Sequence, residues 1–263
     1  MLLSRLCYYF SSLPTLVSGI RNWSALWAVL RRQPVIVTLR DGAQFHVRTL
    51  MDVWVLKEAI LDRQYERAGV AIQDGWTVLD IGAGIGDFAI DVARRNPRAV
   101  VYAFEPFPES FALLEKNMTL NRVGNVRAFP RAISDADGTL ELQVISAEAV
   151  QHTVVSATVR ARQTLRVPSQ TLAHAFAELG IAQCDFLKMD CEGAEYAIFF
   201  NTPPATLRQI KHICLEHHDG VTPHSHADLV CFFEQHGFRV QHIPSPAHRN
   251  LGLLYAANTT PGS

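Results

Sequence analysis

Segment 80–86 has the spacing of a turn that binds a small charged ligand. After an aspartate it places glycine at alternate positions, Gly82, Gly84 and Gly86. Glycine lets the backbone approach a ligand closely, and the helix expected after this turn presents free N–H groups to it. A dinucleotide fingerprint would need glycine at position 87, where this chain has Asp87, and the GK[ST] of a P-loop is missing from the sequence. The turn therefore indicates a ligand other than a dinucleotide, and it is not a P-loop.

Two carboxylates narrow the choice of ligand. Glu105 lies 19 residues beyond Gly86, at the tip of the next expected strand, where a carboxylate can accept two hydrogen bonds from ribose hydroxyls. Asp80 supplies a negative charge suited to an ammonium group. S-adenosylmethionine has both a free ribose diol and an ammonium, and we therefore expect it as the cofactor. The expected cofactor contacts are Asp80, Gly82, Ala83, Gly84, Gly86, Glu105, Pro106, Ile133 and Asp190.

Strands alternate with helices throughout the region that must position these residues. The expected core strands are 76–81, 100–104, 125–133, 184–189, 210–215, 238–243 and 251–257, with β segments at 139–145, 153–159 and 164–167. Helices are expected over 87–96, 108–120, 170–179 and 194–200, and one opens at Thr222-Pro223. Such alternation predicts a parallel sheet covered on both faces. The last two strands are too close in sequence for a parallel crossover and must be antiparallel.

These elements predict an α/β fold of the class I methyltransferase type. It is a Rossmann-like, seven-stranded, mostly parallel sheet with an antiparallel C-terminal strand, preceded by an N-terminal helix and β-hairpin extension. We expect two regions, an extension over 1–70 and an S-adenosylmethionine-binding methyltransferase domain over 71–263.

The extension begins with an amphipathic pattern. Trp23, Leu26, Trp27 and Leu30 repeat at helical spacing, with Asn22 as a plausible N-cap. This helix either packs on the domain that follows or lies on a membrane surface through its tryptophans and flanking arginines. The Asp-Gly pair at 41–42 predicts a hairpin of strands 35–39 and 43–47, and a helix is expected over 52–67. Because no stretch of about 18 uncharged apolar residues exists, we expect no transmembrane helix.

Composition excludes several classes of protein. The chain is 48% hydrophobic and 19% charged, which is typical of a globular protein. Its 24 Lys and Arg residues balance 25 Asp and Glu residues, so we expect no nucleic-acid partner, which would require a basic surface. Its 5 cysteines are odd in number and lack CxxC spacing. Unpaired cysteines of this kind are typical of a reducing compartment, so we expect a cytoplasmic protein, either free or membrane-peripheral through the N-terminal helix. The sequence leaves the oligomeric state unknown.

Six segments resemble the FkbM family of S-adenosylmethionine-dependent O-methyltransferases. They are VLDIGAGIGDF (78–88), YAFEPFPESFALLEKNMTLN (102–121), RAISDADG (131–138), VPSQTL (167–172), FLKMDCEGAEYAIF (186–199) and ICLEHH (213–218). The family usually has Asn where this chain has Gly84, and Asp where it has Ala173. The resemblance implies methylation of a hydroxyl on a sugar, glycolipid or secondary metabolite, so the expected partner is a small-molecule or glycan substrate.

Transfer of a methyl group to an alcohol needs a base, which contributes about 10²- to 10⁴-fold to the rate. The fourth and fifth core strands end in Asp190-Cys191-Glu192 and in Glu216-His217-His218-Asp219, at the edge where ligands bind in parallel sheets. Histidine titrates near neutrality, so His217 or His218 is our first candidate for the base. Asp190 is second, and Glu192 is a candidate for orienting the acceptor or the base. Glu192 could instead simply begin a helix, and the histidine pair could be structural.

Three alternatives remain open at this stage. Eight of the 11 histidines lie between 212 and 248, but their spacing matches no common zinc pattern, and HxH at 224–226 would put the two rings on different faces of a helix, so we expect no metal. The acceptor could be a protein or an amine, although the NPPY-type tetrapeptide of many such enzymes is missing after the fourth strand. The chain could also be a non-catalytic, membrane-peripheral scaffold that binds the cofactor.

Overall fold

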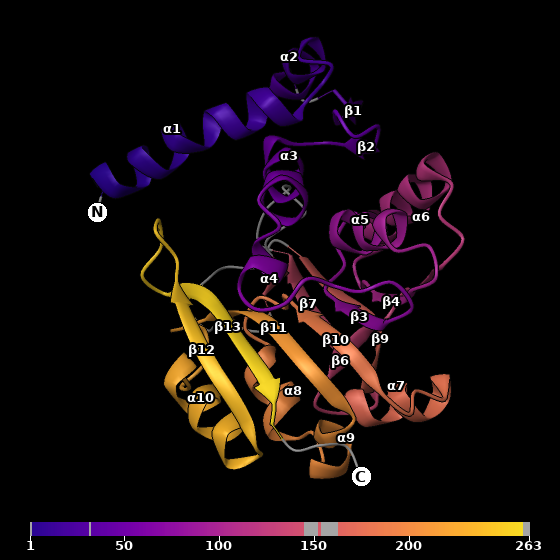
Figure 1. Cartoon of the computed structure of the whole chain (residues 1–263), viewed down its shortest axis with the longest axis vertical. Helices are drawn as coiled ribbons and strands as arrows, with labels where there is room; N and C mark the ends of the chain where they lie inside the picture. The colour runs from indigo at the N-terminus through magenta and orange to yellow at the C-terminus, as the bar shows by residue number, and fades with distance from the viewer. Residues whose placement is uncertain (1, 32, 145–151, 154–162, 260–263) are drawn as a thin grey trace.

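A computed structural model of the protein describes residues 2–31, 33–144, 152–153 and 163–259. Its centre is a seven-stranded sheet with the order β12-β13-β11-β10-β3-β4-β5 (Figure 1). The strands are β3 (Thr77–Ile81), β4 (Val100–Phe104), β5 (Val126–Phe129), β10 (Cys184–Met189), β11 (Ile210–His218), β12 (Phe238–Pro244) and β13 (Leu251–Asn258).

The direction of the strands confirms the expected topology. Neighbouring strands from β5 to β11 pair in parallel, whereas β13 pairs antiparallel with both β11 and β12. The reversed strand is therefore inserted next to the last parallel strand, as expected for a class I methyltransferase.

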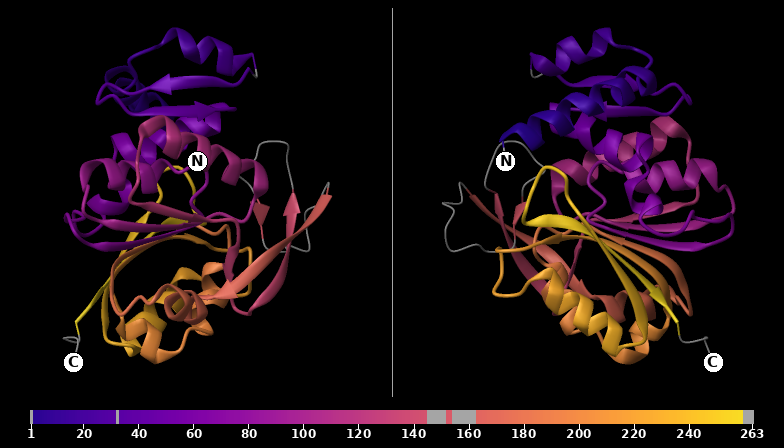
Figure 2. Two further views of the ribbon diagram at one scale, coloured as in Figure 1. Left: turned by 90° about the vertical axis from the view of Figure 1, so that its right-hand side faces the viewer. Right: turned by 60° about the vertical axis from the view of Figure 1, so that its left-hand side comes forward.

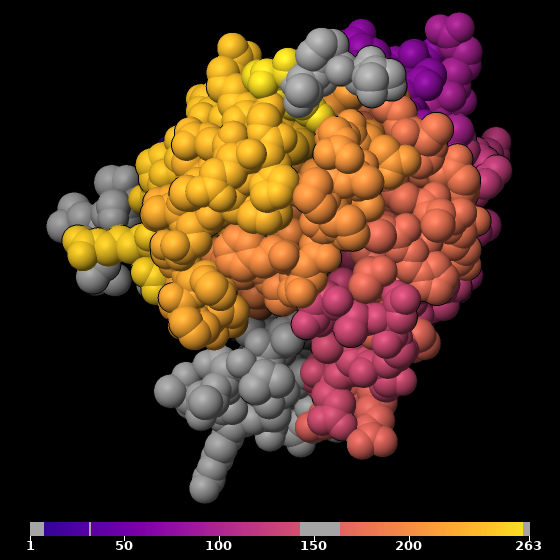
Figure 3. Space-filling model, turned by 90° about the horizontal axis from the view of Figure 1, so that it is seen from below, coloured from indigo at the N-terminus to yellow at the C-terminus, as the bar shows by residue number. Residues whose placement is uncertain are grey.

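Helices cover both faces of this sheet because alternate side chains of its strands enter two separate cores. In β3, Val78 belongs to one core and Leu79 to the other. The first core packs under α5 (Asp87–Arg95) and α6 (Pro108–Asn121). The second packs under α7 (Leu172–Leu179), α8 (Glu195–Phe200), α9 (Pro204–Arg208) and α10 (His226–Gln235) (Figure 2). Seen from below, this second face is formed mostly by the C-terminal half of the chain (Figure 3).

A second sheet stands beside the first and was only partly anticipated. It has the order β6-β9-β7-β8, formed by β6 (Ala132–Ser134), β7 (Gly138–Val144), β8 (His152–Thr153) and β9 (Gln163–Thr171). The single strand expected over 125–133 is therefore wrong: β5 and β6 are separate and join different sheets, with Pro130 between them. Most of the β segment expected over 153–159 falls outside the described residues.

The N-terminal region consists of α1 (Leu2–Gly19), α2 (Ser24–Leu30), the hairpin β1 (Val35–Thr38) and β2 (Gln44–Val47), α3 (Leu50–Leu56), the π-helix η1 (Lys57–Leu61) and α4 (Gln64–Arg67). The hairpin is confirmed. The helix expected over 52–67 is wrong as one element, because Arg63 adopts a left-handed φ of 49° that separates η1 from α4.

Two further expectations about helix ends are wrong. Asn22 does not cap α2, because it accepts a hydrogen bond from the Thr38 N–H at 2.7 Å and donates to the Ile36 carbonyl. Thr222 does not cap α10. Ser225 does, in a capping box with Asp228.

The helix α1 was not predicted, because Pro14 and several serines interrupt its apolar pattern. Tertiary contacts stabilise it: the Tyr8 hydroxyl donates to Glu58 at 2.9 Å, and the Tyr8 ring packs edge-on against Trp54. In the part of the chain that the structure describes, no helix is both long and apolar enough to cross a bilayer.

Residues on either side of position 70 share one hydrophobic core. Val37, Phe45 and Leu56 from the extension are buried in the same cluster as Val78 and Phe88 from the sheet and α5. The extension is thus packed on the sheet, and its helix α4 contacts β11 (Figure 1).

Candidate active site

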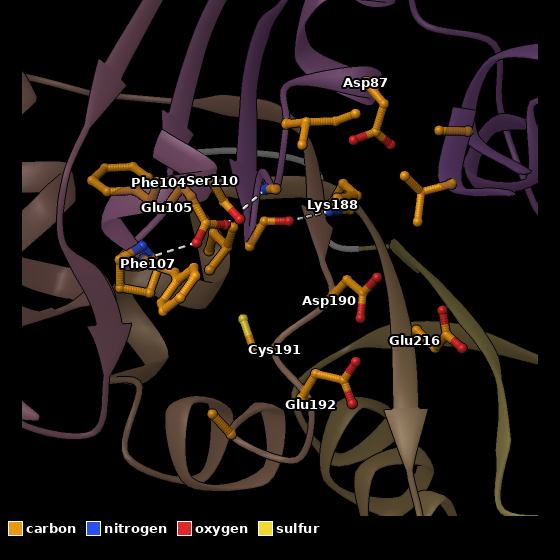
Figure 4. Close-up of a pocket in the computed structure, with 18 of the residues that line it drawn as sticks. Asp87, Phe104, Glu105, Phe107, Ser110, Lys188, Asp190, Cys191, Glu192 and Glu216 are labelled. Carbon is orange, nitrogen blue, oxygen red and sulfur yellow. Dashed lines mark hydrogen bonds between the residues drawn. The ribbon is translucent and has the colours of Figure 1, made fainter. Parts of the chain in front are cut away.

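A pocket opens at the carboxyl ends of β3, β4 and β10 and is roofed by the N-terminal region (Figure 4). The sheet side contributes the glycine turn, Glu105 and the loop after β10, and the roof contributes residues of α3, η1 and α4. Its lining includes Arg48, Asp52, Glu58, Tyr65, Gly82, Gly84, Asp87, Phe104, Glu105, Pro106, Phe107, Ile133, Leu142, Lys188, Asp190, Glu192 and Glu216.

The glycine turn is shaped by three left-handed residues. Gly82, Gly84 and Gly86 have φ values of 74°, 55° and 86°, in the region that L side chains rarely adopt. A Cβ at Gly82 would collide with the Asp190 carbonyl, and one at Gly86 would meet Leu114. A Cβ at Gly84 would make only an ordinary van der Waals contact, with Asp87 Oδ1 at 3.7 Å. Of the expected contacts in this turn, Gly82 and Gly84 line the pocket, whereas Ala83 and Gly86 shape the turn behind it.

Glu105 stands at the tip of β4, where the sequence placed it. Its Oε2 accepts from the Gly84 N–H at 2.7 Å and its Oε1 from the Phe107 N–H at 2.8 Å. Burial raises the pKa of Glu105 to about 7, against the lowering effect of these two hydrogen bonds. The carboxylate keeps free lone pairs toward the pocket, next to Pro106 and Ile133. This arrangement fits a ribose diol.

Asp80 is not placed as expected. It is fully buried, does not line the pocket, and forms an ion pair with Lys188, whose Nζ lies 3.0 Å from Oδ1. Lys188 also donates to the Gly82 carbonyl at 2.7 Å. Burial alone would lower the pKa of Lys188, but Asp80 and the nearby Asp190 raise it above its usual range. The charge of Asp80 thus anchors the glycine turn through Lys188 and is not free for an ammonium group.

The far side of the pocket carries a group of carboxylates, opposite Glu105 (Figure 4). Asp190, Glu192 and Glu216 all line it, and the Tyr65 hydroxyl donates to Asp190 Oδ2 at 3.2 Å. Burial raises the pKa of Glu192 to about 7, while nearby His218 lowers it. Glu192 also has a left-handed φ of 50°, a strained conformation that is common at functional sites. A carboxylate that titrates near neutrality is suited to accept a proton.

Neither histidine of the expected pair lines the pocket. His217 points to the opposite face of the sheet, where its Nε2 lies 3.1 Å from His242 Nε2, and it does not line the pocket. His218 is buried behind the carboxylates. Burial alone would lower its pKa, but the hydrogen bond and charge of Glu195 and the charge of Glu192 raise the pKa of His218 to about 10. His218 therefore carries a proton at neutral pH and cannot accept another.

Asp190, Glu192 and His218 bring potential metal ligands within 4.8 Å of one another. The His218 Nδ1 is occupied by Glu195 Oε1 at 3.1 Å, and its Nε2 faces Glu192 Oε2 at 3.5 Å. A protonated imidazole between carboxylates accounts for this arrangement. We therefore interpret the group as an ion-pair network.

Three residues that line the pocket were not predicted from the sequence. Lys188 was not predicted, because it lies in an apolar strand where a buried charge is not expected. The nearby Asp190 is the one sequence feature that could have indicated a charged partner. Glu216 precedes His217 and His218 in the sequence, and the two histidines were chosen as candidates in its place. Tyr65 reaches the site from α4, 125 residues away from its partner Asp190, and no local pattern indicates such a contact.

Residues 80–240 match the model of the methyltransferase FkbM domain. The chain belongs to the FkbM methyltransferase family. It is an S-adenosylmethionine-dependent methyltransferase, and the resemblance seen in the six sequence segments is confirmed.

Relatives of this FkbM-family enzyme cover most of its length. It is 28% identical over 237 residues to 31-O-demethyl-FK506 methyltransferase FkbM of Streptomyces tacrolimicus, a match that covers 78% of this chain and 90% of the relative. It is 25% identical over 210 residues to hexuronic acid methyltransferase AglP of Haloferax volcanii, covering 79% and 84%. A solved Clostridium thermocellum protein described as an rRNA-methylase has the same fold, with a TM-score of 0.50 at 13% identity, covering 77% of this chain and 97% of that one.

Proposed function

We propose that this FkbM-family enzyme methylates the oxygen of a hydroxyl group on a sugar, glycolipid or secondary metabolite. Two relatives support this substrate class, because one is named for a position on FK506 and the other for a hexuronic acid. The single observation that carries the proposal is the pocket itself, which joins Glu105 on one side to Asp190, Glu192 and Glu216 on the other.

The residues of the pocket fit the cofactor. Gly82 and Gly84 line the pocket without side chains, Glu105 suits a ribose diol, and Phe104, Ile133 and Leu142 offer apolar surface for the adenine ring. When bound, S-adenosylmethionine supplies an activated methyl group. The site supports an in-line displacement by holding the acceptor oxygen and removing its proton, and positioning of this kind contributes up to about 7–11 kcal/mol in ideal cases.

We assign the proton acceptor to Glu192. Its carboxylate faces the pocket and titrates near pH 7, so that a large fraction is deprotonated at neutral pH. Asp190, fixed by Tyr65, and Glu216 are placed to accept hydrogen bonds from the acceptor hydroxyls. Protonated His218, whose Nε2 lies 3.5 Å from Glu192 Oε2, stabilises the deprotonated carboxylate of Glu192 until it accepts the proton of the acceptor hydroxyl.

The experiment is a transfer assay with methyl-labelled cofactor and a fractionated cell extract, followed by identification of the labelled product. A product labelled on a hydroxyl oxygen, formed by the wild type and by the surface control Glu234→Gln but reduced about 100-fold or more in Glu192→Gln, supports the proposal. A product labelled on an amine or a protein side chain contradicts it. Cofactor binding without any labelled product would favour the scaffold alternative.

We further propose that the N-terminal helices rest on an anionic membrane surface, which would bring the pocket near a glycolipid acceptor. Exposed apolar side chains on α1 and α2 support this, since Phe10 is 66% and Trp27 67% exposed. Arg21 and Arg31, also exposed, supply positive charge beside them.

A flotation assay with vesicles containing phosphatidylserine tests the membrane proposal. Wild type should float with the vesicles at low salt, and the double variant Phe10→Ser/Trp27→Ser should stay in the dense fraction, while the control Leu50→Ser, which alters an exposed leucine of α3, floats normally. Equal flotation of the wild type and the double variant, or flotation of neither, would remove the proposal.

A further inference from the structure

Three histidines converge on the face of the sheet opposite the active-site carboxylates. His217 comes from β11, His226 is the first residue of α10, and His242 belongs to β12. One ring nitrogen of each lies within 4.8 Å of the others, and the rings of His226 and His242 stack with centroids 4.2 Å apart. The three ligands come from three separate elements, so their spacing along the sequence matches no zinc pattern.

A carboxylate orients two of these rings. Asp219 Oδ1 lies 3.1 Å from His217 Nδ1, and Asp219 Oδ2 lies 2.6 Å from His226 Nδ1. A carboxylate that accepts from Nδ1–H leaves the Nε2 lone pair of the same imidazole free to bind a metal, as is usual around metal-ligating histidines. Asp219 is itself held in place by the Tyr196 hydroxyl at 2.7 Å and by the His226 N–H at 2.8 Å.

The space beside the nitrogens is kept open by a glycine. Gly252 of β13 pairs with His217 across the sheet, and a Cβ at this position would lie 2.7 Å from His217 Nε2 and 3.1 Å from His242 Nε2. His217 is buried, His226 is partly exposed and His242 is exposed. The group therefore has a fixed inner ligand and an outer side that solvent reaches, through which an ion can enter and a water molecule can complete the coordination.

We propose that His217, His226 and His242 bind a Zn²⁺ ion. Three imidazole nitrogens and one water form the tetrahedral set that Zn²⁺ accepts, whereas Mg²⁺ and Ca²⁺ require mainly oxygen ligands. The bound ion joins β11, α10 and β12, and it therefore stabilises the C-terminal edge of the sheet. This revises our expectation from the sequence, in which no metal was foreseen.

Calorimetric titration of chelator-treated protein with Zn²⁺ alone tests the site. The wild type should bind one equivalent, and the control His174→Ala, which alters a histidine of α7 far along the chain from this group, should bind equally. The double variant His226→Ala/His242→Ala should show no measurable binding, while it keeps buried His217 in place. Asp219→Asn should weaken binding by about 10- to 100-fold, because an amide orients the imidazoles less well.

A second readout separates the proposed site from other metal binding. Zn²⁺ should raise the melting temperature of the wild type but not that of the double variant, since a ligand stabilises only the folded state that binds it. If the wild type binds no Zn²⁺, or if the double variant binds it as well as the wild type does, the proposal is wrong. Loss of binding in Glu192→Gln together with normal binding in the double variant would place the ion at the active site and equally refute it.

Discussion

At the scale of single residues, our proposal for the base of the reaction depends on the environment of each group and not on its residue type. Histidine was the natural choice from the sequence, but His218 sits among carboxylates that keep it protonated, and His217 faces the other side of the sheet. Glu192, whose ordinary pKa would make it a weak base at neutral pH, is raised to about 7 by burial. Sequence identifies the strand ends where such groups gather, but it cannot give the field that each one experiences.

The pH dependence of turnover follows from this assignment. Glu192 must be deprotonated to accept a proton, so turnover at saturating substrate should rise from about pH 6 to about pH 8, with a midpoint near its pKa of about 7. Stopped assays across this range check the profile. A profile that falls with rising pH, or one that keeps the same midpoint in Glu192→Gln, would show that another group is the base.

The ion pair beneath the glycine turn gives a prediction about stability. Lys188→Met leaves Asp80 buried without its partner, which should lower the free energy of unfolding by about 3–5 kcal/mol. The double variant Asp80→Asn/Lys188→Met removes both charges and should recover most of this loss. Urea denaturation of the two variants checks the difference, and equal losses in both would mean that the charge pair is not the source of the effect.

At the scale of elements, the strands of the central sheet were predictable because their apolar runs alternate with helical patterns. The helix α1 was not predictable, because it depends on distant contacts such as that of Tyr8 with Glu58. The break between η1 and α4 was not either, because no local pattern indicates the left-handed φ of Arg63. The turn between β3 and α5 lies between these cases. Its glycines were predicted to contact the cofactor, but only the structure shows that a Cβ would clash at Gly82 and Gly86 and not at Gly84.

Substitutions in this turn should therefore differ sharply. The family usually has Asn where this chain has Gly84, and a φ of 55° is the left-handed region that Asn tolerates best among side chains. Gly84→Asn should retain the fold with a loss of about 1 kcal/mol or less. Gly82→Ala should be far more disruptive, because its Cβ would collide with the Asp190 backbone. Thermal melts of the two variants decide this, and equal melting temperatures would contradict the geometry.

At the scale of the whole molecule, the extension and the sheet act as one unit. Composition and pattern predicted a boundary near residue 70, and this boundary stays a prediction. Burial of Val37, Phe45 and Leu56 with core residues of the sheet leads us to expect that residues 71–263 alone will not fold, since removing the extension would expose their apolar partners to water. Circular dichroism melts of that fragment test this, and a cooperative transition like that of the full chain would contradict it.

The central claim is that one pocket holds the cofactor through Glu105 and carries out chemistry through Glu192. Calorimetric titration with S-adenosylhomocysteine of the wild type, Glu105→Gln and Glu192→Gln tests it most directly. We predict that Glu105→Gln loses about 1.5–3 kcal/mol of binding free energy, the usual value of hydrogen bonds to a charged group, while Glu192→Gln binds like the wild type. Wild-type affinity in Glu105→Gln, or no binding by the wild type, would contradict the account.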